Sequence, residues 1–237
     1  MNKTTISLAV LWMLTWCNLT HADLILTLTS GSSSVVVIDE SPTGTTSSGG
    51  SFNSTVTDSL AGAGIVGYNG AVGSFFVNVT TGISKPLIGP YSIDLNNVSV
   101  SGSAGTLAIQ LIDTNFIAPT SGTYTALSEF GGTTNGFISS ATGGVLDSNA
   151  EVGFAADTFQ GPFGPGAFSG TDTADVSLSG SFSMNTVVTI THTGAGQITS
   201  FDHKFSMVPE PMTCAPLLGL TGLCWLRRRR RSIAQCV

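Results

Sequence analysis

Side chains that could carry acid–base or nucleophilic chemistry are few between residues 23 and 207 of this 237-residue chain. That stretch has two histidines and no cysteine, and it lacks a hydrolase nucleophile elbow, a phosphate-binding loop and an H-E-x-x-H zinc motif. His192 continues a run of apolar residues at even positions, which predicts a buried histidine with satisfied hydrogen bonds. The segment Asp202-His203-Lys204 contains residue types that could form an acid–base pair. A solvent-exposed strand end is the simpler interpretation of this segment. We therefore expect no enzymatic activity.

One segment has the spacing of a calcium ligand set. Asp147, Asn149 and Glu151 place oxygen ligands at alternate positions, as the opening of a calcium-binding loop does. The sixth position of such a loop is Val152 rather than glycine, and the twelfth is Thr158 rather than glutamate. A polar turn is the simpler interpretation of the segment. Calcium is the one cofactor with any support in the sequence, and we expect no other.

Charge and cysteine usage exclude several classes of function. Between residues 23 and 207, thirteen carboxylates face only Lys85 and Lys204, and two minus thirteen gives a net charge of −11. This charge disfavours nucleic acid and anionic lipid as partners, and it also favours solubility. The four cysteines all lie outside this stretch, which excludes cysteine nucleophiles, thiolate metal sites and disulfides within it. Aromatic side chains for stacking on sugars are scarce, because the stretch has three tyrosines and no tryptophan.

Residues 1–22 have the pattern of a secretory signal peptide. Lys3 gives the positive start, residues 6–16 form the apolar stretch, and small residues precede a cleavage position between Ala22 and Asp23. We therefore expect export, with the secretion translocon and signal peptidase as partners. The mature domain is expected over residues 23–207, which is long enough for one packed core.

The C-terminal residues 208–237 combine three features in a fixed order. Val208-Pro209-Glu210-Pro211 contains two prolines that fix φ and lack backbone donors, which keeps the segment extended and open to another protein. The fifteen residues 212–226 carry no charge and predict a short transmembrane helix of roughly 22 Å, less than the roughly 30 Å hydrocarbon core. A membrane-stop cluster follows, which marks the cytoplasmic side and consists of Arg227, Arg228, Arg229, Arg230 and Arg231. The short span predicts a temporary membrane handle rather than a lasting anchor.

This ordered triple resembles the PEP-CTERM sorting signal of exported bacterial proteins. The resemblance covers roughly the last thirty residues and rests on Pro209-Glu210-Pro211, the apolar stretch and the arginine cluster. It implies recognition and processing by an exosortase, a membrane-embedded cysteine transpeptidase. It further implies an inner-membrane intermediate, delivery to the cell surface or outside the cell, and an association with exopolysaccharide. The chain continues after the arginines through residues 232–237, where many members of the family end sooner.

The pattern of residues 23–207 alternates between apolar and polar side chains almost throughout, which predicts β-strands. Leu24, Leu26 and Leu28 show this alternation, and a change of phase at Asn96-Asn97 indicates a bulge or turn. Apolar residues at even positions from 176 to 192 predict one long strand or a hairpin folded near Asn185.

Glycine-rich stretches punctuate the pattern. Residues 44–51 are expected to form a mobile surface loop, and Gly131-Gly132 is expected to lie between strands. No 3.6-residue period continues for three turns. The expected fold class is therefore all-β, an antiparallel β-sandwich resembling a jelly roll, with a signal peptide before it and the sorting helix after it.

Three functions stay open. The first is a non-catalytic cell-surface or extracellular-matrix protein that an exosortase sorts. The second is a glycan-binding or adhesive β-sandwich, which a shallow face of tyrosines and polar groups would favour. The third is a secreted polysaccharide-active enzyme, which requires two carboxylates to meet at about 5 to 9.5 Å in a cleft.

Overall fold

The computed structural model describes the central part of the chain. The described residues are 24–39, 44–48, 51–56, 58, 60–118, 120–146 and 157–209. They form fourteen strands and no helix, so within these ranges no helix could cross a membrane. The expected signal peptide, the expected span at 212–226 and the calcium candidate at 147–151 all lie outside the described residues.

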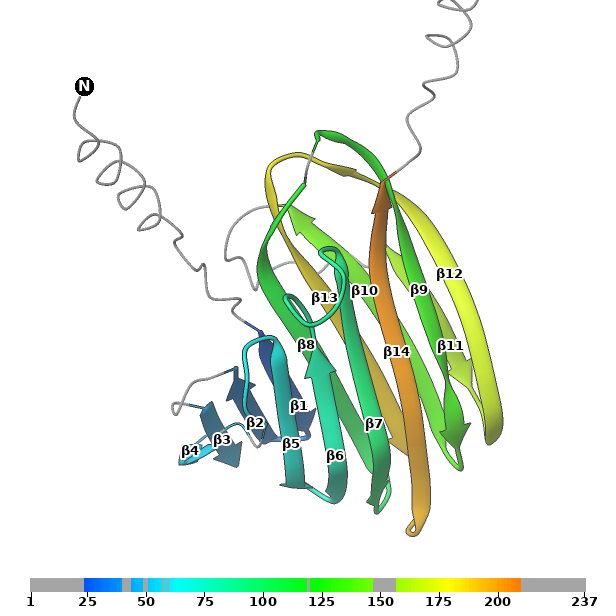
Figure 1. Ribbon diagram of the computed structural model, residues 1–237. Helices are drawn as coiled ribbons and strands as arrows, with labels where there is room; N and C mark the ends of the chain where they lie inside the picture. Colours follow the sequence, from blue (N-terminus) through cyan, green and yellow to red (C-terminus); the bar gives the residue numbers. More distant parts are fainter. Residues whose placement is uncertain are drawn as a thin grey trace, which may run out of the picture.

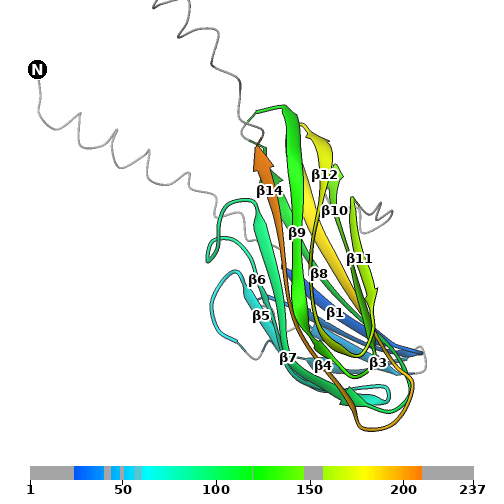
Figure 2. The same ribbon diagram turned by 90° about the vertical axis from the view of Figure 1, so that its right-hand side faces the viewer.

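The strands lie in two antiparallel sheets that face each other (Figures 1 and 2). The strands are β1 (Ile25–Ser30), β2 (Ser33–Ile38), β3 (Gly44–Ser48), β4 (Ser51–Val56), β5 (Ile65–Val72), β6 (Phe75–Ile83), β7 (Ser92–Gly102), β8 (Gly105–Ile117), β9 (Gly122–Thr134), β10 (Phe137–Leu146), β11 (Thr158–Phe163), β12 (Gly166–Leu178), β13 (Ser181–His192) and β14 (Gln197–Pro209). The eight-stranded sheet has the order β11-β10-β13-β8-β1-β2-β3-β4, and the six-stranded sheet has the order β12-β9-β14-β7-β6-β5. The all-β, two-sheet prediction is confirmed.

The core lies between the two sheets and follows the predicted alternation. Leu24, Leu26 and Leu28 are fully buried, as their spacing predicted. The larger fully buried side chains come from both sheets, and they are Tyr124, Phe75, Phe116, Phe182 and Phe205. Burial of this apolar surface is the main stabilising term, since the described residues of the domain contain no cysteine for a disulfide.

The apolar run from 176 to 192 forms two strands in different sheets rather than one strand or one hairpin. β12 ends at Leu178 in the six-stranded sheet, and β13 begins at Ser181 in the eight-stranded sheet. Gly180 makes the turn with a φ of 79°, and Asn185 lies inside β13 rather than at a fold. The prediction failed because both sheets face one core, so the same alternation continues across the crossover.

Two further predictions concern local irregularities. Residues 44–51 were expected to be a loop, but 44–48 form β3, which pairs with β2 and β4. Threonine favours a pleated strand, and β3 lies between β2 and the edge strand β4. The bulge predicted at Asn96-Asn97 lies directly after this pair, because Thr199 pairs with Val100 whereas Phe201 pairs with Asn97, so β7 has an extra residue between Asn97 and Val100.

A buried ion pair fixes the connection between β6 and β7 to the end of β8. Lys85 Nζ donates a hydrogen bond to Asp113 Oδ1 at 2.8 Å, and Ser84 Oγ donates to the other oxygen of this fully buried carboxylate. The ammonium also lies 3.7 Å from the centroid of the Phe116 ring. Burial raises the pKa of Asp113, and its hydrogen bonds with Lys85 and Ser84 oppose that rise.

Replacing Lys85 with methionine should destabilise the domain. The change keeps much of the apolar stem but leaves the buried carboxyl of Asp113 without its cation, which costs about 3 kcal/mol of unfolding free energy. Urea unfolding measures this loss. Lys204→Met is the comparison, because Lys204 is exposed on β14 and makes only surface interactions, so its loss should cost at most about 1 kcal/mol. Equal effects of the two substitutions would contradict the structural role of Lys85.

Candidate functional site

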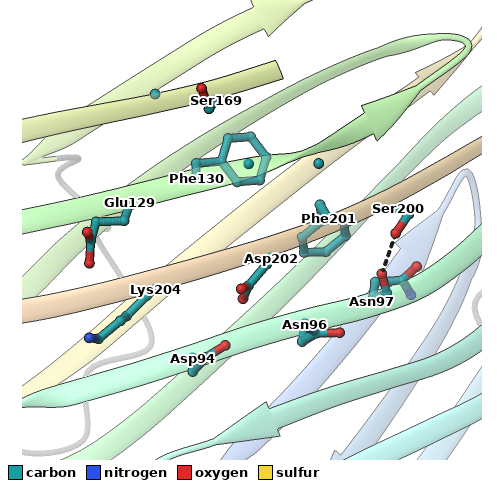
Figure 3. A pocket seen from close by; sticks show the side chains of 13 residues that line it. Asp94, Asn96, Asn97, Glu129, Phe130, Ser169, Ser200, Phe201, Asp202 and Lys204 are labelled. Carbon is teal, nitrogen blue, oxygen red and sulfur yellow. Dashed lines mark hydrogen bonds between the residues drawn. The ribbon is translucent and has the colours of Figure 1, made fainter. Parts of the chain in front are cut away.

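A groove of about 770 Å³ lies on the outer face of the six-stranded sheet. Residues of four adjacent strands, β12, β9, β14 and β7, line it (Figure 3). Its middle is β14, which is paired on one side with β7 and on the other with β9. The groove is therefore built across the strands rather than by loops at the end of the sandwich.

The alternation of each strand decides which side chains reach the groove. In β14, Phe201, His203 and Phe205 are buried in the core, so Asp202 and Lys204 point outward. In β7, buried Ile93 and Leu95 leave Asp94 and Asn96 on the outer face. The outward groups of the groove from the other two strands are Glu129 of β9 and Ser169 of β12.

The strand register places one cation between two carboxylates. Lys204 lies directly opposite Asp94 on β7 and opposite Glu129 on β9. Two residues before it, Asp202 lies opposite Asn96 and Gly131. Cross-strand pairs of opposite charge stabilise a sheet by roughly 0.2 to 1 kcal/mol. The groove thus combines three carboxylates with a single ammonium group among its described lining residues.

Asp94 and Asp202 carry carboxyl groups on the outer face of neighbouring strands β7 and β14. The pKa of Asp94 is raised to about 6, first by partial burial and then by the charge and the hydrogen bond of Asp202, while Lys204 opposes the rise. Two carboxyl groups hydrogen-bond directly only when one of them holds a proton. Asp94 is therefore the carboxyl group that holds a proton under mildly acidic conditions.

Glycines in β9 open the floor of the groove. A Cβ on Gly131 would meet its nearest atom, the Phe168 carbonyl oxygen, at 3.5 Å, so a side chain would fit there and would occupy the groove. A Cβ on Gly132 would instead lie 2.8 Å from Phe201 Cα, which shows how closely β9 and β14 approach. The pair was predicted between strands, but it lies inside β9, where glycine weakens a strand and often marks the approach of a ligand or another backbone.

The prediction of a solvated strand end at Asp202-His203-Lys204 is wrong. His203 is fully buried in the middle of β14, on the face opposite Asp202 and Lys204. Its Nε2 is hydrogen-bonded to Ser128 Oγ at 2.9 Å, and its Nδ1 to Thr186 Oγ1 at 2.6 Å. Asp202 and His203 therefore cannot act together as an acid–base pair.

His203 belongs to a polar network that joins the two sheets beneath the groove. Gln160 Nε2 of β11 donates a hydrogen bond to Ser128 Oγ of β9 at 2.8 Å, and Thr186 lies on β13. Burial lowers the pKa of His203 to about 3, so its ring is neutral at pH 7. Phe130 packs its ring edge-on at 5.0 Å between centroids. The network holds the four strands in register and is sealed from solvent.

His192 is buried, as its position in the apolar run predicted. Its Nε2 is hydrogen-bonded to Thr199 Oγ1 at 3.0 Å, and its ring packs 5.3 Å from that of Phe75. Its Nδ1 has no hydrogen-bond partner among the described residues. Only one of the two ring nitrogens therefore has the hydrogen bond that was predicted for a buried histidine. Burial lowers the pKa of this histidine.

The structure describes only the first two residues of the predicted sorting segment, Val208 and Pro209. Val208 and Pro209 are the last two residues of β14 and lie opposite Thr125 and Tyr124, so their backbone is extended. The other predicted residues lie outside the described ranges, and they are Glu210, Pro211, Ala22, Asp23, Asp147, Asn149, Glu151 and Arg227 to Arg231. Within the described part of the chain, no group of three or more histidine, cysteine or acidic residues could hold a metal ion.

The groove was not predicted from the sequence. Its charged residues Asp94, Glu129 and Asp202 are far apart in the sequence, and only the strand register brings them onto one face. A usable signal was present in two features of the sequence. Charged residues occupied outward positions of predicted strands, and a glycine pair interrupted one of these strands.

Comparisons with known proteins do not place the chain in a family. No family model matches it, and no curated protein matches it. Among solved structures, the isomalto-dextranase of Arthrobacter globiformis T6 complexed with panose is similar at 14% identity, with a TM-score of 0.22. The similarity covers 60% of this chain and 23% of the dextranase chain. At this TM-score it carries no argument about function.

Replacing Asp94 with asparagine should change how stability depends on pH. The pKa of Asp94 in the folded state, about 6, lies above its unfolded value near 3.9. The contribution of Asp94 to the free energy of unfolding is therefore fully present below pH 3.9 and is lost as the pH rises through 6. The asparagine amide can still donate a hydrogen bond to Asp202. We expect the variant to gain about 1 kcal/mol over wild type between pH 4 and 7.5, a figure reduced for solvent screening of a partly exposed group. Denaturant titrations at each pH give the difference, and a gap that does not change with pH would refute the assignment.

Proposed function

We propose that this chain is an exported, non-catalytic bacterial surface or extracellular-matrix protein that binds exopolysaccharide in its groove. The observation that carries this proposal is the open groove of hydrogen-bonding side chains across β12, β9, β14 and β7. An exosortase sorts and processes the protein through residues 208–231. A signal peptide at residues 1–22 brings it to the translocon, and it passes through an inner-membrane intermediate.

The proposed architecture is a jelly-roll-like sandwich. Its support is the strand order, because β12-β9-β14-β7 in one sheet faces β11-β10-β13-β8 in the other. The strands of each facing pair are consecutive in the chain and change sheet between them. This is the two-Greek-key order of eight-stranded jelly rolls, with β1 to β6 added at one side.

The chemistry of the groove favours a ligand rich in hydroxyl groups. Asn96, Ser169 and the carboxylates supply acceptors and donors for sugar hydroxyls, and the absent side chain of Gly131 leaves room above the sheet. Three carboxylates against one lysine repel polymers of uronic acids, so we assign neutral polysaccharide to the groove. Among its described lining residues the groove has no exposed aromatic side chain on which a sugar ring could stack. We therefore expect weak binding at each groove, which becomes stronger when many copies bind along one polymer.

A polysaccharide-active enzyme is the second candidate, because the raised pKa of Asp94 would suit a general acid. Against it, Lys204 lies opposite both Asp94 and Glu129, and its charge opposes the raised pKa that a general acid needs. Release of reducing ends from neutral polysaccharides, abolished by Asp94→Asn, would replace the binding proposal with this one.

Replacing Gly131 with leucine should block binding while preserving the fold. The position accepts a Cβ, and the added isobutyl group would fill the groove, so affinity for a neutral polysaccharide should fall at least about tenfold. Affinity electrophoresis in gels containing glucans or other neutral polymers measures the loss. Thr123→Leu is the matched control, because it lies on the same outward face of β9 but about 26 Å away along the strand. A glycan array on which wild type binds no neutral sugar, or on which both variants bind equally, would reject the groove.

Mature protein recovered from the surface should lack the arginine cluster, because the exosortase removes the membrane handle. Glu210→Gln and Pro211→Ala should each leave precursor in the inner membrane, since the arginine cluster still stops transfer. Both changes lie beyond β14, so the folded domain should keep its stability. Mass spectrometry and fractionation provide the readout. Surface protein that still ends at Val237 would reject the processing step.

A further inference from the structure

Exposed apolar side chains occur at the end of the sandwich from which β14 leads to the sorting segment. Leu87 is 56% exposed, Ile117 is 69% exposed and Val208 is 46% exposed. We call these three residues the exit patch. They come from the β6–β7 connection, the end of β8 and the end of β14 (Figure 1). Val208 faces outward from the six-stranded sheet and Ile117 from the eight-stranded sheet, because Met207 and Phe116 beside them are buried. The three residues therefore surround this end of the sandwich. Unlike other exposed apolar residues such as Phe76 and Ile198, they lie where the chain leaves the fold.

Two hydrogen bonds made by Tyr91 bring these segments together. The Met207 amide donates to the Tyr91 carbonyl oxygen at 2.9 Å, next to Val208. The Tyr91 hydroxyl donates to the Ile117 carbonyl oxygen at 3.0 Å. Leu87 belongs to the same connection as Tyr91, and Lys85 ties that connection to β8 through Asp113. The exit patch is therefore held by fixed contacts.

A bulge in β8 turns Ile117 to the outside. Asp113 pairs with Met184 whereas Phe116 pairs with Phe182, so β8 has an extra residue in this interval. Asn115 takes a positive φ of 61° there. Without the bulge, the alternation of β8 would bury position 117 and expose position 116. The strained backbone of Asn115 thus lies at the place where Ile117 becomes exposed.

The proposed membrane segment begins very close to this patch in the sequence. Pro209, the last residue of β14, is three residues before Met212, where the uncharged stretch 212–226 begins. Three residues span at most about 11 Å. A helix of fifteen residues is also shorter than the hydrocarbon core, so its insertion draws the flanking residues towards the bilayer.

We propose that the exit patch rests on the interfacial layer of the bilayer while the precursor is held by residues 212–226. The inference rests on the proposed sorting function and adds the lipid surface as a partner of the folded domain. The patch is apolar and uncharged, whereas the domain is strongly acidic, so zwitterionic lipid is the occupant that fits. Seating of the exit patch would hold the processing segment at a fixed depth before the exosortase acts.

Photolabelling of the precursor in vesicles tests this contact. Residues 23–237 are reconstituted in phosphatidylcholine vesicles that contain a phosphatidylcholine with a diazirine near its glycerol backbone. After irradiation, mass spectrometry locates the labelled residues. We expect label at Leu87 and Ile117, and at least threefold less label overall at this end in the Leu87→Ser, Ile117→Ser double variant. The matched internal control is Phe159 of β11, which is 58% exposed and lies outside the exit patch, and should carry no label.

The pattern of label separates the proposals. Label in 212–226 but not at Leu87 or Ile117 would overturn the contact and leave the proposed sorting function intact. Absence of label from 212–226 would remove the membrane handle and, with it, both proposals. Equal labelling of Phe159 and Ile117 would show unspecific contact and overturn the inference. Cross-links from the exit patch to a second copy, without lipid label, would assign the patch to self-association and also overturn it.

Discussion

The pairing of β14 with β7 on one side and β9 on the other is the constraint on which the groove and the core beneath it depend. Because a strand alternates its side chains, this register sends His203 into the core and Asp202 and Lys204 into the groove. A slip by one residue would exchange these faces, burying an aspartate and a lysine and exposing a neutral histidine. The hydrogen bonds of His203 to Ser128 and Thr186 oppose that slip.

The buried polar groups divide into two kinds of structural role. The network of His203, Ser128 and Gln160 lies between the sheets and specifies which strands face each other. The Lys85–Asp113 pair instead fixes a connection to the end of the sandwich. Neither set reaches the groove, whose outward side chains are exposed or, like Asp94, half-buried. The molecule therefore separates groups that hold the fold from groups that can meet a ligand.

The sequence predicted the class of fold because alternation is a local property of each strand. Leu24, Leu26 and Leu28 could be assigned to the core without knowing their partners. Pairing and crossover are not local, which is why the run from 176 to 192 was interpreted as one strand or hairpin although it changes sheet at Gly180. The same limit hid the groove, since Asp94 and Asp202 become neighbours only through the register of β7 and β14. Composition was also misleading at Gly131-Gly132, because a glycine pair suggests a turn unless the neighbouring strands are known.

The position of β14 has a mechanical consequence. This strand lines the groove and also leads directly to Pro209, so a pull between a bound polymer and a C-terminal attachment would act along its axis. Along that direction, the hydrogen bonds to β7 and β9 are loaded in shear, and many must break together instead of one after another. The neighbouring strands share the tension across the width of the sheet. Under such a load the sheet would resist unfolding better than its equilibrium stability alone would indicate.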